Sequence, residues 1–95
     1  MIVRTTEIYD KWFGKLRDEL AKATIARRIR RIEQEGFFGD HKIFDGIGEL
    51  RFDIGPGYRA YYARRGEIII FLLCGGDKDG QQKDISRAKE LAKRI

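Results

Sequence analysis

The chain has 95 residues, of which 42% are hydrophobic and 37% charged, so its length and composition predict one folded domain over residues 1–95. Lysine and arginine number 20 against 15 acidic residues, and the formal net charge of +5 favours a polyanionic partner, either nucleic acid or an acidic protein segment. No apolar run approaches the ~18 residues of a membrane span, and the first residues lack a signal peptide's apolar region, so we expect a cytoplasmic protein that contacts no membrane. A single cysteine, Cys74, excludes an internal disulfide and a cysteine metal cluster.

The N-terminal third predicts a short strand and two helices. Residues 2–5, IVRT, are typical of a strand, and Thr6 is a plausible N-cap for the following helix. Apolar residues then recur at helical spacing: Ile8, Trp12, Leu16, Leu20, Ile25, Ile29 and Ile32. Gly36 predicts the C-terminal end of the helical region. One straight helix of this length could not pack on a small sheet, so we expect a break at residues 21–24 and an antiparallel helical hairpin.

Three strand candidates and a closing helix follow. The strand candidates are the run 41–54 (HKIFDGIGELRFDI), the run 58–64 (YRAYYAR) and the run 67–74 (EIIIFLLC). The third is apolar without alternation, as expected of a central strand that is covered on both faces, and residues 64–67 predict a hairpin turn before it. The closing helix, in 79–95, has an inward stripe of Ile85, Ala88, Leu91, Ala92 and Ile95. This order predicts an α+β fold, with the N-terminal strand and helical hairpin packed on a curved, mostly antiparallel sheet that also carries a C-terminal helix.

The stretch GPGYRAYYARRG, residues 55–66, carries arginine and tyrosine on both faces of its predicted strand. Because successive side chains of a strand point to opposite faces, one face carries Tyr58, Ala60, Tyr62 and Arg64, and the other carries Arg59, Tyr61, Ala63 and Arg65. We expect Tyr58 and Tyr62 to pack in the core. We expect Arg59 and Tyr61 on the outer face, with Arg51 pointing to it from the neighbouring strand.

Three segments in combination carry a family resemblance: ARRIRRIE, GELRFDIGPGYRAYYARRG, and LLCGGDK followed by DI and RAKELA. Over about residues 3–94 the chain resembles the phage-derived, Gp49-like, HigB-type addiction-module killer proteins of the RelE/ParE toxin superfamily. The resemblance implies a RelE-like fold and a toxin of a type II toxin–antitoxin system. It also implies a ribosome-dependent endoribonuclease that cuts messenger RNA without a metal ion or organic cofactor, and a cognate antitoxin of helix-turn-helix type.

The resemblance extends to individual residues. Arg59, directly after the GPGY turn, matches the arginine that contacts the scissile phosphate in RNA-cutting members. Arg51 falls on the preceding strand, where basic site residues occur, and Lys78 falls in the loop before the closing helix, where another cation usually lies. The chain departs from the RNA-cutting pattern because no tyrosine and no histidine follows residue 62.

The chemistry leaves the proton carriers open. Arginine pairs bidentately with phosphate oxygens but is a poor general acid or base. The proton carriers are then Lys78, a tyrosine of the 58–62 run, Glu49, Asp77 or ribosomal RNA, with Lys78 preferred over Tyr61 and Tyr61 over Glu49. Tyr61 could also stack a splayed base. The predicted catalytic set is therefore Arg59, Arg51, Lys78 and Tyr61, and the predicted RNA-binding set is Arg27, Arg28, Arg31 and Arg65.

Two other functions remain open at this stage. A ParE-type inhibitor of DNA gyrase would have the same fold, and the missing C-terminal proton-transfer residue favours it. The other is a non-catalytic module that binds nucleic acid or an antitoxin. Of the remaining reactive groups, Cys74 is expected to be a buried structural thiol, and His41, the only histidine, is more often structural than functional at such a position.

Overall fold

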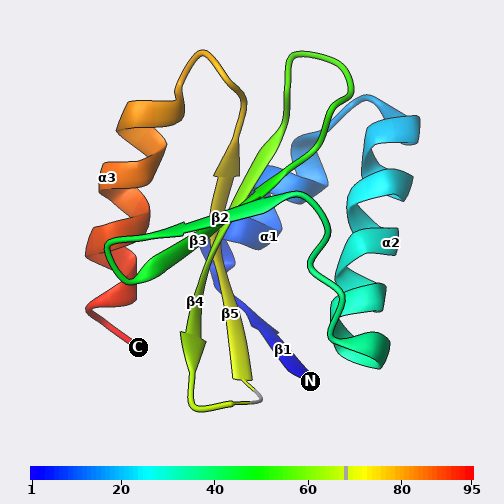
Figure 1. Cartoon of the computed structure of the whole chain (residues 1–95). Coiled ribbons are helices and arrows are strands. Elements are labelled where there is room, and N and C mark those ends of the chain that lie inside the picture. Colours follow the sequence, from blue (N-terminus) through cyan, green and yellow to red (C-terminus); the bar gives the residue numbers. More distant parts are fainter. Residues whose placement is uncertain (68) are drawn as a thin grey trace.

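The computed structural model describes residues 1–67 and 69–95. Along the chain the elements are β1 (Ile2–Thr5), α1 (Glu7–Lys15), α2 (Glu19–Glu35), β2 (His41–Phe44), β3 (Ile47–Arg51), β4 (Arg59–Arg65), β5 (Ile69–Gly76) and α3 (Gln81–Ala92). One five-stranded sheet has the order β1-β5-β4-β3-β2. Only the pair β1–β5 is parallel among its four pairings. In Figure 1, α2 and α3 flank the sheet from opposite sides. The predicted α+β class and mostly antiparallel sheet are confirmed.

The helical region begins and ends at the residues that the sequence predicts, but it breaks earlier. Thr6 caps α1, because its side chain accepts a hydrogen bond from the Tyr9 backbone N–H, and Gly36 ends α2 in the left-handed conformation at φ 67°. The break lies at residues 16–18, not at 21–24, since the Asp18 side chain accepts from the Ala21 N–H and starts a second helix. Leu20 is consequently 71% exposed and does not belong to an inward stripe.

The run 41–54 forms two strands and not one. β2 and β3 pair antiparallel around Asp45 and Gly46, whose φ angles of 50° and 81° are both positive. Two consecutive residues with positive φ, occupied by Asp-Gly, are typical of a tight two-residue hairpin. The Asp-Gly pair in the sequence was the signal for this turn. At the other predicted turn, Gly66 has a φ of 65°, while position 68 of the predicted strand 67–74 lies outside the described residues.

The sheet has a hydrophobic cluster on each face. The first cluster lies under α1 and α2 and includes Leu50, Ala60, Tyr62, Ile70 and Leu72, with Tyr58 packed against it. The second lies under α3 and includes Tyr61, Ala63, Leu73 and Cys74, with Ile85, Leu91 and Ala92 packed against it. Tyr58 and Tyr62 therefore pack as predicted, β5 is covered on both faces, and Cys74 is buried. Ile95 lies beyond the end of α3 and is 42% exposed, so the predicted inward stripe stops short of it.

The helices offer no membrane-spanning element in the described part of the chain. All three are too short or too polar to cross a bilayer.

Candidate functional site

A cleft at one end of the sheet gathers three of the four predicted catalytic residues. Its volume is about 270 Å³, and its lining is Asp40, Arg51, Phe52, Asp53, Gly57, Arg59 and Lys78. Arg51 and Arg59 are directly opposite each other in the pairing of β3 with β4. Two loops carry most of the remaining lining, residues 52–58 and 77–80, and they rise together at one end of the molecule in Figure 1. Asp40, directly before β2, completes it. The sheet register and these loops thus bring together cations that are distant in the sequence.

Arg59 is held in the cleft by the backbone of the turn that precedes it. Its Nη1 donates to the carbonyl oxygens of Gly57 and Tyr58, both at 3.1 Å. Its Nε is buried, and the described residues supply no acceptor for it. The Arg59 guanidinium is therefore fixed in place at the cleft by its own turn.

Arg51 is held by a buried acid of its own strand, β3. Its Nε donates to Glu49 Oε1 at 2.9 Å, and the Arg51 side chain keeps 34% of its surface exposed. The hydrogen bond that Arg51 donates to Glu49 is the main cause that raises the pKa of Arg51 above its ordinary value. Arg51 is thus a permanent cation at the cleft, and its Nε already donates a hydrogen bond to Glu49.

Lys78 reaches the cleft across a glycine. Gly57 has a φ of 78°, and a Cβ built on it would lie 3.2 Å from Lys78 Cβ and 3.6 Å from Arg59 Nη1. The Lys78 backbone N–H is 3.4 Å from the Pro56 oxygen, which ties its loop to the GPG turn. A side chain at position 57 would strain the turn and press against the Lys78 Cβ, while its Cβ would make an ordinary contact with Arg59. The GPG turn therefore lets Lys78 and Arg59 converge.

Two aspartates of the cleft were not identified from the sequence. Asp40 and Asp53 line it beside the three cations, and both are exposed. Asp77, one of the proton carriers that the sequence suggests, makes local hydrogen bonds in the adjacent loop. Its Oδ1 accepts from the N–H groups of Asp79 and Gly80. The cleft thus carries carboxylates that can accept a proton as well as cations that can bind an anion.

Tyr61 is not in the cleft, contrary to the prediction. It lies in the second hydrophobic cluster and is 0% exposed, because α3 covers the face that was expected to be open. Burial, and then the negative charge of Glu49, raise the pKa of Tyr61 well above its ordinary value. Tyr61 therefore stays a neutral phenol that cannot stack an RNA base.

Replacing Tyr61 with phenylalanine is expected to leave activity unchanged and to leave the thermal midpoint unchanged or higher. The Tyr61 hydroxyl is buried and makes no hydrogen bond of good geometry in the described structure, although Glu49 lies close enough to contribute to its raised pKa. Removing it ends a desolvation cost and gives up at most a weak contact. Thermal unfolding by circular dichroism and a growth-arrest assay measure the two effects. Loss of growth arrest in a folded Tyr61→Phe protein would restore Tyr61 to the site.

The predicted RNA-binding arginines of α2 differ from one another in their surroundings. Arg28 donates to the carbonyl oxygens of Phe38, Asp40 and Arg51 at 3.1–3.3 Å, and its guanidinium lies 4.6 Å from the Phe52 ring centroid. Arg28 is thus a structural tie between α2 and the sheet, which corrects the prediction. Arg31 lies 3.8 Å over the Phe37 ring and pairs with Glu35. Arg27 is exposed on the helix surface.

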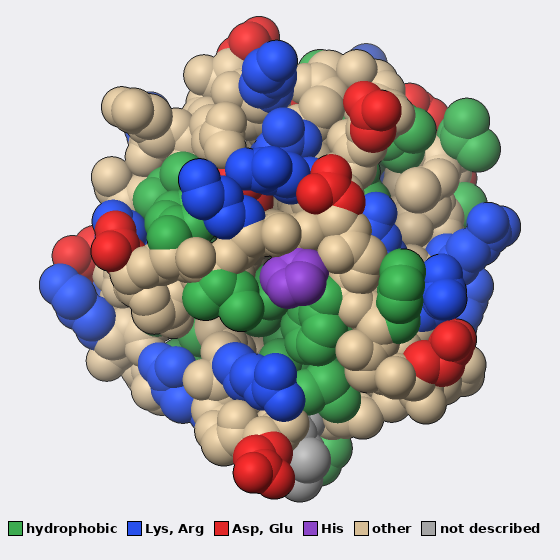
Figure 2. All heavy atoms as spheres, in the orientation of Figure 1, with side chains coloured by type: hydrophobic (Ala, Val, Ile, Leu, Met, Phe, Trp, Pro, Cys, Tyr) green, Lys and Arg blue, Asp and Glu red, His purple; other side chains and the backbone are tan. Residues whose placement is uncertain are grey.

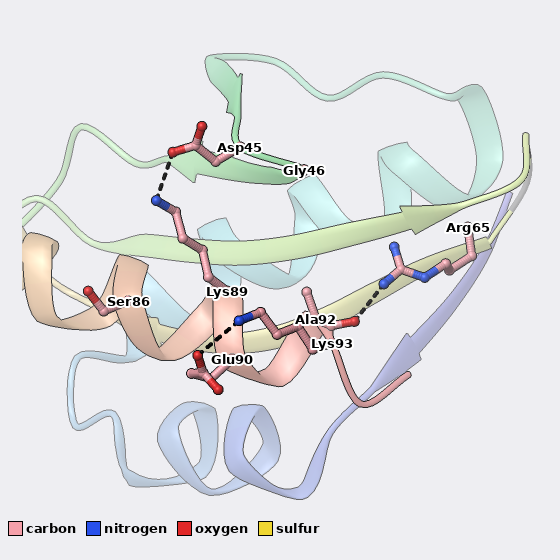
Figure 3. A pocket seen from close by; sticks show the side chains of 8 residues that line it. All are labelled: Asp45, Gly46, Arg65, Ser86, Lys89, Glu90, Ala92 and Lys93. Atoms are coloured by element: carbon pink, nitrogen blue, oxygen red, sulfur yellow. Dashed lines mark hydrogen bonds and ion pairs between the residues drawn. The ribbon is translucent and has the colours of Figure 1, made fainter.

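Arg65 is likewise a structural residue. Its Nη2 donates to the Ala92 oxygen at 2.6 Å, so it neutralises the C-terminal end of α3. Figure 3 shows this contact at the edge of a larger hollow of about 560 Å³ between the β2–β3 turn and α3. There Lys89 binds Asp45 at 2.7 Å and Lys93 binds Glu90 at 3.3 Å. Arg65, Lys89 and Lys93 thus have partners, whereas among the described residues no carboxylate pairs with Arg59 or Lys78, so the cleft of about 270 Å³ is the better anion site.

His41 lies between charged and apolar regions of the surface. In Figure 2 it sits near the middle of the view, with hydrophobic side chains beside and below it and a group of lysines and arginines above it. Its Nδ1 is 2.8 Å from the Gly39 oxygen, and it lines a hollow of about 240 Å³ with Phe38, Ile43 and Tyr62. His41 thus lines a different hollow from the three cations.

Metal ligands do not converge in the described ranges 1–67 and 69–95. No group of three or more histidine, cysteine, aspartate or glutamate side chains lies close enough to hold an ion there. The ionisable groups that line the cleft are arginine, lysine and aspartate side chains.

Solved structures with this fold include the Escherichia coli toxin RelE. A chain of the intact E. coli RelBE toxin–antitoxin complex matches with a TM-score of 0.65 and 14% identity, over 80% of this chain and 94% of that one. The isolated E. coli RelE toxin matches with a TM-score of 0.64 and 13% identity, over 90% of this chain and 96% of that one. At these identities the likeness concerns the fold, which is the predicted RelE-like fold.

Sequence comparison gives a relative but no family model. No protein-family model matches the chain. An uncharacterised protein of Haemophilus influenzae is 49% identical over 94 residues, which cover 98% of this chain and 94% of that protein. Identity of this extent shows common descent across the whole domain, so the chain belongs to the family of this Haemophilus influenzae protein and has the RelE fold.

Proposed function

We propose that this protein is the toxin of a toxin–antitoxin pair, of the HigB type, and that it cleaves messenger RNA on the ribosome without a metal ion. The observation that carries the proposal is the convergence of Arg51, Arg59 and Lys78 in one cleft, where backbone carbonyl groups hold the Arg59 guanidinium in place. A phosphate group fits this arrangement, because guanidinium groups pair with its oxygens. The RelE fold and the basic net charge agree with it.

The reaction is an attack of the 2′-hydroxyl on the adjacent phosphorus. A bond forms between the 2′-oxygen and phosphorus while the bond from phosphorus to the 5′-oxygen breaks, which leaves a 2′,3′-cyclic phosphate and a 5′-hydroxyl. Arg59 and Arg51 would stabilise the charge that develops on the phosphate oxygens. The Lys78 ammonium would protonate the leaving 5′-oxygen, and Asp40 or Asp53 would accept the proton of the 2′-hydroxyl.

Primer extension on transcripts from cells that express the chain tests this function. Discrete new 5′ ends should appear within translated regions as growth stops. The same transcripts from cells with stalled initiation should stay intact, because the proposed substrate is the translated message. Growth arrest with intact transcripts would contradict RNA cleavage.

Inhibition of DNA gyrase is the second candidate. It is favoured by the lining of the cleft, where the described residues include no histidine and no tyrosine to move protons. Purified gyrase separates the two functions, since an RNA-cutting toxin leaves supercoiling unchanged while a gyrase inhibitor lowers it at stoichiometric amounts.

The proposed partner is a cognate antitoxin, of helix-turn-helix type, encoded beside the toxin. The exposed Arg27 on α2 and the cationic cleft offer surfaces for an acidic partner, and charge complementarity speeds capture. Co-expression with each adjacent reading frame should identify one product that restores growth and co-purifies. An adjacent gene set without such a product would contradict the pairing.

A further inference from the structure

Glu49 stands apart because it is the one fully buried charged side chain among the residues that the structure describes. It lies on β3 opposite Tyr61 and is 0% exposed. Removing a carboxylate from water is costly unless hydrogen bonds replace the lost solvation. The hydrogen-bond partners of Glu49 therefore indicate why a carboxylate is buried at this position.

Both oxygens of Glu49 have a partner, and the two partners belong to different elements. Oε1 accepts from Arg51 Nε at 2.9 Å, within the same strand. Oε2 accepts from Gln81 Nε2 at 2.7 Å, at the first residue of α3. One carboxylate thus connects the strand that carries a cleft arginine to the helix that closes the second face of the sheet.

The contact with Arg51 determines how its guanidinium is presented. A guanidinium is planar, so a bond at Nε fixes the plane and leaves the two Nη groups to bind an anion as a fork. Arg51 lines the cleft and keeps 34% of its side chain exposed. With Nε bound to Glu49, the two Nη groups are the donors that Arg51 has left for an anion in the cleft.

Through its hydrogen bond to Gln81, Glu49 also holds the end of the loop that carries Lys78. Gln81 follows Lys78 by three residues, and its backbone N–H lies 3.4 Å from the Lys78 oxygen. The loop that presents Lys78 therefore ends on the residue that Glu49 holds. Displacing Gln81 would release the anchor at the C-terminal end of that loop.

We propose that Glu49 is a positioning residue, which orients Arg51 and anchors the Lys78 loop through Gln81 so that both cations meet the same phosphate. The proposal rests on the proposed RNA-cutting function and deepens it. Glu49 does not itself transfer a proton to the substrate, because it is fully buried and both its oxygens are occupied. A buried ion pair contributes little net stability compared with apolar packing, so the geometry of Arg51 is the property that the pair provides.

The test compares Glu49→Gln with Arg51→Ala, with the double variant and with Glu90→Gln. Single-turnover cleavage of a messenger RNA on purified ribosomes gives the rate at saturation and the half-saturating concentration. Glu49→Gln should lower the rate roughly 10- to 100-fold, the effect of a slightly misplaced catalytic contact, with the half-saturating concentration little changed. In the Arg51→Ala background it should cause only the smaller loss that acts through Gln81 and the Lys78 loop. Glu90, whose side chain is 66% exposed and pairs with Lys93, provides the matched control, and its variant should keep the wild-type rate.

A second measurement tests the contact between Glu49 and Arg51 without an RNA-cleavage assay. Nitrogen-15 NMR of the wild-type protein should show the Arg51 Nε–H in slow exchange with water, and this signal should shift and lose protection in Glu49→Gln. A wild-type protein that cuts no RNA would refute the proposed function, while the NMR signal would still report on Arg51. Three results would overturn the positioning role: a double variant in which the two single losses multiply in full, a Glu49→Gln rate equal to wild type, or an Arg51 Nε–H that exchanges as fast as that of exposed Arg94. If Glu49→Gln does not fold, the exchange rate in the wild type decides.

Discussion

Replacing Arg59 with alanine is expected to lower the rate of RNA cleavage by about two to three orders of magnitude and to abolish growth arrest. Its guanidinium is fixed at the cleft by the carbonyl groups of Gly57 and Tyr58. A donor that is held in place before the substrate arrives needs no reorganisation when charge develops on the phosphate. The rate in a ribosomal cleavage assay measures the effect.

Arg94→Ala is the matched control for charge. Arg94 is exposed, lies after the end of α3 and is not part of the cleft lining, so its loss changes the net charge equally and should leave cleavage unchanged. Thermal unfolding shows whether Arg59→Ala remains folded. A folded Arg59→Ala protein that arrests growth as fast as the wild type would remove Arg59 from the site.

Replacing Arg28 with alanine is expected to lower the free energy of unfolding by about 2–4 kcal/mol, a sum over several charged hydrogen bonds and a cation–π contact. Its donors bind the carbonyl oxygens of Phe38, Asp40 and Arg51, and its guanidinium covers the Phe52 ring. Its loss would leave these carbonyls without their charged donor and detach α2 from the end of β3. Burial is the main cause that lowers the pKa of Arg28, which agrees with a desolvated cation.

Arg27→Ala provides the comparison within the same helix. Arg27 is exposed, and substitutions at such positions usually change stability by less than about 0.5 kcal/mol. Urea unfolding of both variants measures the difference. Equal stability of the two proteins would show that the contacts of Arg28 do not hold α2 on the sheet.

The sequence by itself determined the elements whose cause is local. Thr6 and Gly36 delimit the helical region because a side-chain oxygen and a left-handed glycine satisfy helix ends wherever they occur. The apolar run in β5 predicted burial on both faces, since no polar side chain interrupts it. Alternation in β4 correctly separated Tyr62 from Arg59 and Tyr61, because opposite faces follow from backbone geometry alone.

Only the tertiary structure decided what covers each face and which charges find partners. Alternation assigns Tyr61 and Arg59 to one face, but α3 buries Tyr61 and leaves the Arg59 end at the cleft. Neighbouring arginines on α2 look alike in the sequence, yet Arg28 meets three carbonyl groups and Arg27 meets solvent. The link from Glu49 to Gln81 joins residues 32 apart. A residue's own neighbours in sequence determine its local backbone and its face, whereas its burial and its partners depend on distant elements that fold onto it.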